Sequence, residues 1–239
     1  KRSFNNSADH LRAELEASLR RLQVESVDLY YIHRRDQSIP VEEVMNTLLA
    51  FKAEGKIGGI GFSEIAPGTL RRAAAVGPVD AVQSEYSLWT RQPELGMIQT
   101  CKELGVAFVP FSPVGRGMFT AKAPRPDLFS AGDFRIPNPR FQEPNFTFNL
   151  RHVDAFRKLA HDLGCTPAAL AIAWCLAQGY HLVPIPGTRK AAHLQDCAAG
   201  SGFVMTDEIM AAIERILPIG WAHGDRYSTD QRLGVEGYC

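Results

Sequence analysis

The chain has 239 residues, of which 45% are hydrophobic, so it is long enough to bury the core of one α/β domain. Its 26 basic and 26 acidic side chains cancel, which excludes the global positive field that a nucleic-acid partner or an anionic membrane surface would need. No apolar run approaches the roughly 18 residues that span a bilayer, so we expect no membrane partner and a cytoplasmic location. We predict a single domain over residues 1–239.

The cysteines and the start of the chain add two expectations. The five cysteines are odd in number and widely spaced, which fits reduced thiols better than a disulfide framework or a zinc site, and we predict no metal. The chain begins with Lys1 rather than Met, within an expected loop that leads to a helix. We therefore expect it to be a fragment of a longer protein.

The first predicted elements are a helix and a strand. Ser7 is placed to cap a helix in which leucines recur at helical spacing over residues 11–22. A buried strand occupies the first half of residues 27–36, because β-branched, aromatic and leucine residues cluster where the helical period stops. His33 lies at the polar end of this strand. We expect its ring to be half desolvated there, with one N–H donor and one acceptor of fixed direction.

Strands and helices then alternate along the chain. Further strands are predicted at 57–62, 81–86, 107–111 and 182–185, and helices at 41–54, 67–75, 94–104, 150–163, 167–178, from 186–189 onward, and at 207–216. Residues 118–149 hold five prolines and no sustained period, and their six phenylalanines argue against disorder, so we interpret this long loop as a lid or cofactor-covering segment. An irregular tail covers 217–239.

This alternation predicts parallel strands with covering helices. Two architectures remain, a doubly wound open sheet and a (β/α)8 barrel, and the lack of Gly-x-Gly-x-x-Gly after an early strand disfavours the first. In a barrel the site is built from polar residues at the carboxyl ends of the strands. All five predicted strands end in such residues, namely His33, Ser63, Glu64, Gln83, Ser84, Glu85, Ser112, Gly187, Thr188 and Arg189.

The strand ends also indicate what such a rim would bind. Segments 115–117 and 187–189 place glycines beside an arginine and would offer backbone N–H groups next to a cation, a combination suited to phosphate. Phe111 would stack on a flat ring, and Ser63 and Gln83 would hydrogen-bond an amide. Taken singly, each of these residues is better explained by core packing, strand capping or turn formation than by ligand binding.

Six blocks carry a family resemblance. They are Asp-Leu-Tyr-Tyr-Ile-His at 28–33, Gly-Phe-Ser-Glu at 61–64, Gln-Ser-Glu-Tyr-Ser-Leu at 83–88, Val-Pro-Phe-Ser-Pro-Val-Gly-Arg-Gly at 109–117, Asn-Pro-Arg-Phe at 138–141 and Pro-Ile-Pro-Gly-Thr at 184–188. In this order they resemble the aldo-keto reductases, most of all the microbial NADP(H)-dependent branch. The resemblance implies a (β/α)8 TIM barrel that binds extended NADP(H) at its carboxyl rim, and an oxidoreductase that reduces an aldehyde or ketone to an alcohol by hydride transfer from NADPH.

The resemblance also implies roles for particular residues. His33 matches the active-site histidine that orients the substrate carbonyl, and Phe111 matches the aromatic ring that stacks on nicotinamide. The other matches to cofactor-binding positions are Ser63 and Gln83 at the carboxamide, Ser112, Pro113, Val114, Gly115, Arg116 and Gly117 at the pyrophosphate, Gly187, Thr188 and Arg189 near the 2′-phosphate, and His193, Asp196 and Cys197 at the adenine end. Three departures from the family pattern are Phe111 for Tyr, Glu64 for Asn and Cys197 for Asn.

One part of the family pattern has no match in this chain. The resemblance places the proton-donating Tyr and its assisting Lys and Asp upstream of residue 28. Since five strands are predicted where a barrel has eight, we expect about three preceding βα units, roughly 90 residues. Two functions stay open, a carbonyl reductase in the full-length protein and a catalytically incomplete, cofactor-binding regulatory or remnant protein. A barrel enzyme of unrelated chemistry is a third alternative. The oligomeric state is not predicted.

Overall fold

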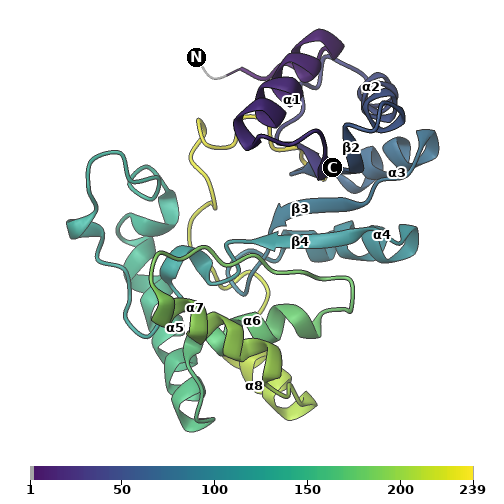
Figure 1. The fold of residues 1–239 in the computed structure, drawn as a ribbon. Helices are drawn as coiled ribbons and strands as arrows, with labels where there is room; N and C mark the ends of the chain where they lie inside the picture. Colours follow the sequence, from purple (N-terminus) through teal and green to yellow (C-terminus); the bar gives the residue numbers. More distant parts are fainter. Residues whose placement is uncertain (1–2, 239) are drawn as a thin grey trace. The chain divides into compact units, whose positions relative to one another are not determined.

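The computed structural model describes residues 3–238, which divide into two compact units. The first unit comprises Lys1–Ser84, Glu94–Val109 and Leu233–Cys239, and the second comprises Glu85–Pro93 and Pro110–Arg232. Each is described by itself, with the elements labelled as in Figure 1. The expected single domain stays a prediction.

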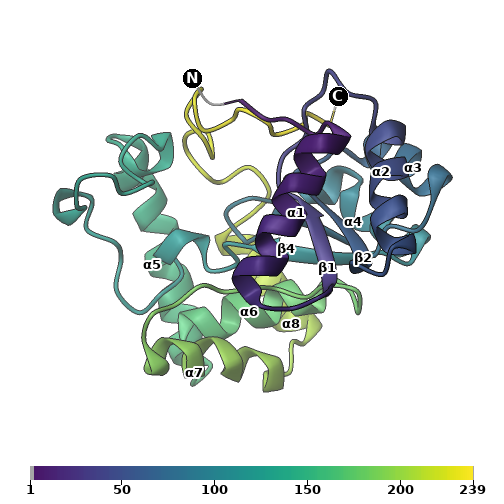
Figure 2. The same cartoon turned by 45° about the horizontal axis from the view of Figure 1, so that its top comes forward.

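The first unit is built on a parallel sheet. The strands β1 (Val27–Ile32), β2 (Ile57–Ser63), β3 (Ala81–Glu85) and β4 (Ala107–Phe111) lie in this order, with the last residues of β3 and β4 counted in the second unit. The helices are α1 (Ala8–Leu22), α2 (Val41–Ala53), α3 (Pro67–Val76) and α4 (Met97–Leu104). Helices separate successive strands because a parallel connection has to cross back over the sheet. In Figures 1 and 2, α2 and α3 lie side by side.

The core of the first unit follows from the helix periods. Leu15 of α1 and Leu48 of α2 are fully buried, as are Ile60 and Phe62 of β2. In the register of β1 with β2, Tyr31 lies opposite Gly61, where an added Cβ would approach the tyrosine ring to 2.5 Å. A side chain at position 61 would therefore overpack this part of the sheet.

The second unit is helical. Its helices α5 (Asn145–Asp162), α6 (Pro167–Ala177), α7 (Ala191–Ala199) and α8 (Asp207–Ile216) gather together, and the loop after β4 and the tail to residue 232 complete it (Figure 1). The helix α6 buries nine consecutive residues, as its all-round apolar sequence predicts. No single helix within residues 3–238 is long and apolar enough to cross a membrane; α5 and α6 reach that length and composition only as a pair bent by 92°.

The predicted fifth strand at 182–185 is wrong. This segment carries only isolated bridge residues, Leu182 and Ile185; at the second, the Ile185 amide donates to the Pro110 carbonyl at 2.9 Å. Pro184 and Pro186 flank Ile185, and proline is rare inside strands because it has no amide hydrogen to donate.

Three helix boundaries also differ from the predictions. The segment 94–104 is broken at Gly96, whose φ is 143°, into a short 3-10 helix (Gln92–Leu95) and α4. The helix α5 begins at Asn145 rather than 150, so the long loop ends five residues earlier than predicted. The helix after the 186–189 segment begins only at Ala191. The predicted helix at 207–216 is confirmed as α8.

Candidate functional site

Three predicted site residues lie at the carboxyl ends of strands in the first unit. His33 follows β1 directly, Ser63 ends β2, and Gln83 of β3 is paired with Ser63 in the strand register. Carboxyl ends of neighbouring parallel strands meet at one edge, so these residues form a polar rim, which we call the first-unit rim. His33 is exposed; β1 is the edge strand of the sheet formed by the described residues, and Ile32 is its only buried residue.

An arginine that the sequence analysis did not single out joins two of these strand ends. Arg34 Nη1 donates to the His33 carbonyl oxygen at 2.5 Å and to Ser63 Oγ at 2.9 Å. Ser63 is only 3% exposed, so this hydrogen bond satisfies a hydroxyl oxygen that water cannot reach. The serine hydroxyl accepts from Arg34 and keeps its own proton to donate.

The turn after β2 is held by the end of the chain. Glu64 has φ of 56°, a left-handed conformation that costs a non-glycine residue roughly 1–2 kcal/mol. Its amide donates to the Gln83 carbonyl at 2.9 Å, and its carbonyl accepts from the Glu236 amide at 3.0 Å. Glu236 Oε2 accepts from the Ala66 amide at 2.9 Å, and its Oε1 lies 3.4 Å from Nε of buried Arg35. These contacts hold the turn in its strained conformation.

The loop after β4 belongs to the second unit and is tightly folded. Ser112, Gly115, Arg116 and Gly117 all have positive φ, which for the two non-glycine residues is again strained. The Gly115 amide donates to the Ser112 carbonyl and the Gly117 amide to the Val114 carbonyl. The expected exposed N–H groups of Gly115 and Gly117 are therefore a wrong prediction, since both amides are used inside the loop.

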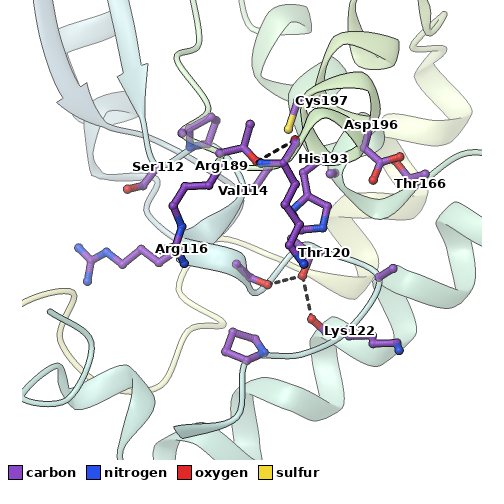
Figure 3. A pocket seen from close by; sticks show the side chains of 18 of the residues that line it. Ser112, Val114, Arg116, Thr120, Lys122, Thr166, Arg189, His193, Asp196 and Cys197 are labelled. Atoms are coloured by element: carbon purple, nitrogen blue, oxygen red, sulfur yellow. Dashed lines mark hydrogen bonds between the residues drawn. The ribbon is translucent and has the colours of Figure 1, made fainter. Parts of the chain in front are cut away.

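A large pocket opens beside this loop (Figure 3). Its volume is about 1400 Å³, and its walls come from the loop after β4, the start of α6, and α7 with the segment before it. It brings together most of the predicted cofactor-binding residues, namely Phe111, Ser112, Pro113, Val114, Arg116, Gly117, Gly187, Thr188, Arg189, His193, Asp196 and Cys197. Gly115 lies outside the lining, because its α-carbon faces the rings of Phe119 and Trp89.

The pocket lining is strongly basic. Lys122, Arg189, Lys190 and His193 line it, and none of them makes an ion pair within the described part of the chain. Asp196 is the single acidic residue of the lining. Unpaired cations in a concave site attract anions and raise their local concentration. The lining therefore favours a ligand with several negative charges.

Two further arginines of the lining are already paired. Arg135 makes a two-point contact with Asp133, at 3.0 and 2.7 Å, and this guanidinium lowers the pKa of the Asp133 carboxyl. Arg116 Nη2 donates to Glu85 at 2.6 Å, and the Arg116 side chain is only 8% exposed. The predicted role of Arg116 as the cation beside a phosphate is weakened, because it is already paired with a buried carboxylate.

One part of the pocket is apolar. Cys197 packs with Ala168 and Ile172, and Val114 lies against this cluster. Burial raises the pKa of the Cys197 thiol, and the neighbouring Asp196 carboxylate raises it further. The thiol therefore stays protonated near neutral pH and acts as a small apolar wall. Figure 3 shows Cys197 and Asp196 on neighbouring positions of α7.

The sequence analysis missed several residues that shape these regions. Lys122 and Thr120 come from the proline-rich loop; the Thr120 hydroxyl lies 2.7 Å from the Gly117 carbonyl oxygen and 2.8 Å from that of Lys122 (Figure 3). Arg34 and Glu236 hold the first-unit rim. None of these residues carries a motif signal, because a lone charged or hydroxylic residue in a loop is common. Within residues 3–238, no group of three or more His, Cys, Asp or Glu side chains is placed to hold a metal ion.

Comparison with curated proteins finds relatives over nearly all of the chain. It is 40% identical over 228 residues to the aldo-keto reductase yakc of Schizosaccharomyces pombe, whose name includes NADP(+), covering 94% of this chain and 67% of the relative. It is 41% identical over 224 residues to probable aldo-keto reductase 1 of Glycine max, covering 94% and 64%. The chain spans about two thirds of the length of these relatives.

Solved structures and a family model agree with these relatives. The glycerol dehydrogenase AKR11B4 from Gluconobacter oxydans matches with a TM-score of 0.83 and 31% identity, over 91% of this chain and 66% of that one. A thermostable aldo-keto reductase, Tm1743, solved with the inhibitor epalrestat, matches with a TM-score of 0.70 and 25% identity, over 88% and 67%. These matches confirm the predicted α/β fold of the aldo-keto reductase barrel type. The sequence model of the aldo/keto reductase family matches residues 1–218, and the chain therefore belongs to that family.

Proposed function

We propose that the protein containing this chain is an NADP(H)-dependent oxidoreductase that reduces a small aldehyde or ketone to an alcohol. The observation that carries the proposal is the basic pocket, whose cations Lys122, Arg189, Lys190 and His193 have no carboxylate partner within the described residues. Family membership supports a dinucleotide as the anionic ligand, and the name of the S. pombe relative supports the phosphorylated form.

The residues present fit such a cofactor. A volume of about 1400 Å³ exceeds the roughly 300–1000 Å³ of ordinary small-ligand pockets, which leaves room for an extended dinucleotide. Thr188, Arg189 and Lys190 would hold the 2′-phosphate, next to the uncapped start of α7, where amide groups and the helix dipole favour an anion. Val114 and Cys197 would pack on the adenine ring, with His193 and Asp196 at its edge.

The same proposal assigns the pyrophosphate to the loop after β4. Since the Gly115 and Gly117 amides are used within the loop, the charge of Lys122 is the better candidate to balance the pyrophosphate. The loop residues Ser112, Pro113 and Gly117 would shape the wall along which it lies. Phe111 would present its ring to the nicotinamide.

The residues of the first-unit rim would bind the substrate carbonyl and the carboxamide of the cofactor. NADPH, when bound, supplies a hydride to a carbonyl carbon. The His33 ring would donate an N–H to the carbonyl oxygen, so that developing negative charge meets a donor already in place. Ser63 would donate its remaining proton to a carboxamide oxygen, and Gln83 would offer an amide to the same group.

The test separates binding from turnover. Calorimetric titration of the protein with NADPH measures binding. The rate of NADPH oxidation with a panel of aldehydes and ketones measures turnover. We expect His33→Ala to lower kcat by about 100-fold, in the usual range for a lost acid–base or oxyanion contact, and to leave the Kd for NADPH unchanged.

His10→Ala is the matched control, because His10 is an exposed histidine of α1 outside every site described above. Its kcat and Kd should equal those of the unaltered protein. If NADPH binds but is not oxidised with any aldehyde or ketone, the protein binds the cofactor without turnover and the reductase proposal fails. Unchanged kcat in His33→Ala would remove the assignment of His33.

A further inference from the structure

The strained loop of the second unit contains Arg116, whose guanidinium bonds to residues outside the loop. Arg116 has φ of 55° and ψ of 31°, a conformation that a non-glycine residue keeps only where its surroundings hold it. Arg116 Nη1 donates to the Arg226 carbonyl at 2.8 Å, and its Nη2 to Glu85 at 2.6 Å. Its guanidinium lies over the rings of Phe134 and Tyr227, at 5.2 and 4.8 Å from their centres. The loop conformation is therefore tied to the C-terminal tail.

Glu85 is the shared acceptor of this cluster. Besides Arg116, its carboxylate receives Nη1 of Arg226 at 3.2 Å and the Thr90 hydroxyl at 3.3 Å, and Glu85 is only 3% exposed. A buried carboxylate with two guanidinium partners is sensitive to the loss of either one, because little water can replace it. Arg226 therefore affects how Glu85 holds Arg116.

The tail itself is firmly placed within the second unit. The Trp221 indole donates to the Leu88 carbonyl at 2.7 Å, and the His223 amide donates to Asn149 Oδ1 at 2.8 Å. The Asn138 side-chain amide donates to the Arg226 carbonyl at 2.5 Å. These bonds hold the backbone before residue 226 and the Arg226 carbonyl itself, so this carbonyl is presented to Arg116 at a fixed position.

We propose that Arg226 and Tyr227 of the tail are positioning residues for cofactor binding, acting through Arg116 on the loop 112–117. The inference rests on the proposed NADP(H) function. Both residues lie beyond residue 218, where the match to the family model ends. The tail holds the loop in the strained form that shapes the pocket wall, and the cofactor then binds a wall that is already ordered.

The experiment compares ring removal with ring retention at one position. Tyr227→Ala removes the ring beneath the Arg116 guanidinium, whereas Tyr227→Phe keeps it. We expect Tyr227→Ala to raise the Kd for NADPH about tenfold and to speed amide hydrogen exchange over residues 112–119 in the protein without NADPH. Tyr227→Phe should restore both values toward those of the unaltered protein, which a general loss of stability would not explain.

A second pair of variants keeps the proposal testable if Tyr227→Ala does not fold. Arg226→Met removes one partner of Glu85 and should change both readouts in the same direction by a smaller factor. Arg232→Met is its matched control, since Arg232 is a tail arginine whose partner is the exposed Asp225. If the unaltered protein binds NADPH while Arg226→Met leaves Kd and exchange unchanged, the tail inference is overturned. If the unaltered protein binds no NADPH, the proposed function fails first.

Discussion

The first-unit rim and the pocket of the second unit are both polar, but they differ in what their polar groups already bind. At the rim, Arg34 is bonded to Ser63 and to the His33 carbonyl, and Glu236 is bonded to the turn after β2. In the pocket, by contrast, four residues have no acidic partner among residues 3–238, namely Lys122, Arg189, Lys190 and His193. The rim's hydrogen bonds stabilise the fold, whereas the pocket's cations contribute once an anion binds.

This difference indicates which of the two regions supplies the binding free energy for a ligand and which one orients it. A hydrogen bond to a charged group contributes about 1.5–3 kcal/mol when its charge is otherwise unpaired. The pocket should therefore supply most of the affinity for a polyanionic cofactor. The rim holds its donors in fixed directions, which suits orientation of a reacting group rather than affinity.

The largest effect is expected from reversing charge in the pocket. The double variant Arg189→Glu, Lys190→Glu should raise the Kd for NADPH at least about 100-fold, because two cation–phosphate contacts become repulsive. The unfolding free energy should hardly change, since neither side chain makes an ion pair within the described residues. Calorimetric titration and chemical denaturation measure the two quantities.

Lys102→Glu is the control for this comparison, because Lys102 is exposed on α4 and lies outside the pocket lining. It changes the net charge in the same direction without altering the pocket lining, so it should shift Kd only slightly and only at low salt. An unchanged Kd in the double variant would show that the unpaired cations do not hold the cofactor.

At the rim the expected effect is on stability. Arg34→Met removes the donor to buried Ser63 Oγ and should lower the unfolding free energy by about 1–2 kcal/mol. A double-mutant cycle with Ser63→Ala isolates this contact, and the two changes together should cost less than their sum. Arg20→Met on the exposed face of α1 is the control. Additive costs would mean that the Arg34–Ser63 hydrogen bond stabilises nothing.

The sequence predicts the secondary structure of a segment best where the spacing of its hydrophobic residues follows a helix or a strand. The four strands of the first unit and the buried helix α6 were predictable, because apolar runs and helical stripes record burial directly. The segment 182–185 has the same apolar character, but it forms only isolated bridges, and its prolines lower its strand propensity. Its hydrophobic pattern alone therefore did not predict its structure.

The candidate site shows a different limit. The glycine and arginine segments 112–117 and 187–189 do line one pocket, as strand-end reasoning suggested. The sequence could not tell which cations are free, however. Arg116 is paired with Glu85, 31 positions away, and Arg226 is paired with the same carboxylate from 141 positions away. Ion pairing between distant segments is set by tertiary structure and leaves no local pattern.

The smallest expected effect concerns a thiol and tests the apolar end of the pocket. Because burial raises the pKa of Cys197, its thiolate fraction near neutral pH is low, and alkylation should be slower in the folded protein than in the denatured chain. The rate should rise as the pH approaches the raised pKa. If adenine packs on this wall, saturating NADPH should slow the alkylation of Cys197 several-fold more.

Cys165, partly exposed outside the pocket lining, also has a raised pKa and should show the same rate with and without NADPH. Mass spectrometry of timed, quenched samples gives both rates from one experiment. Equal slowing of both thiols would indicate general tightening of the fold, and no slowing of Cys197 in a protein that binds NADPH would place the adenine elsewhere.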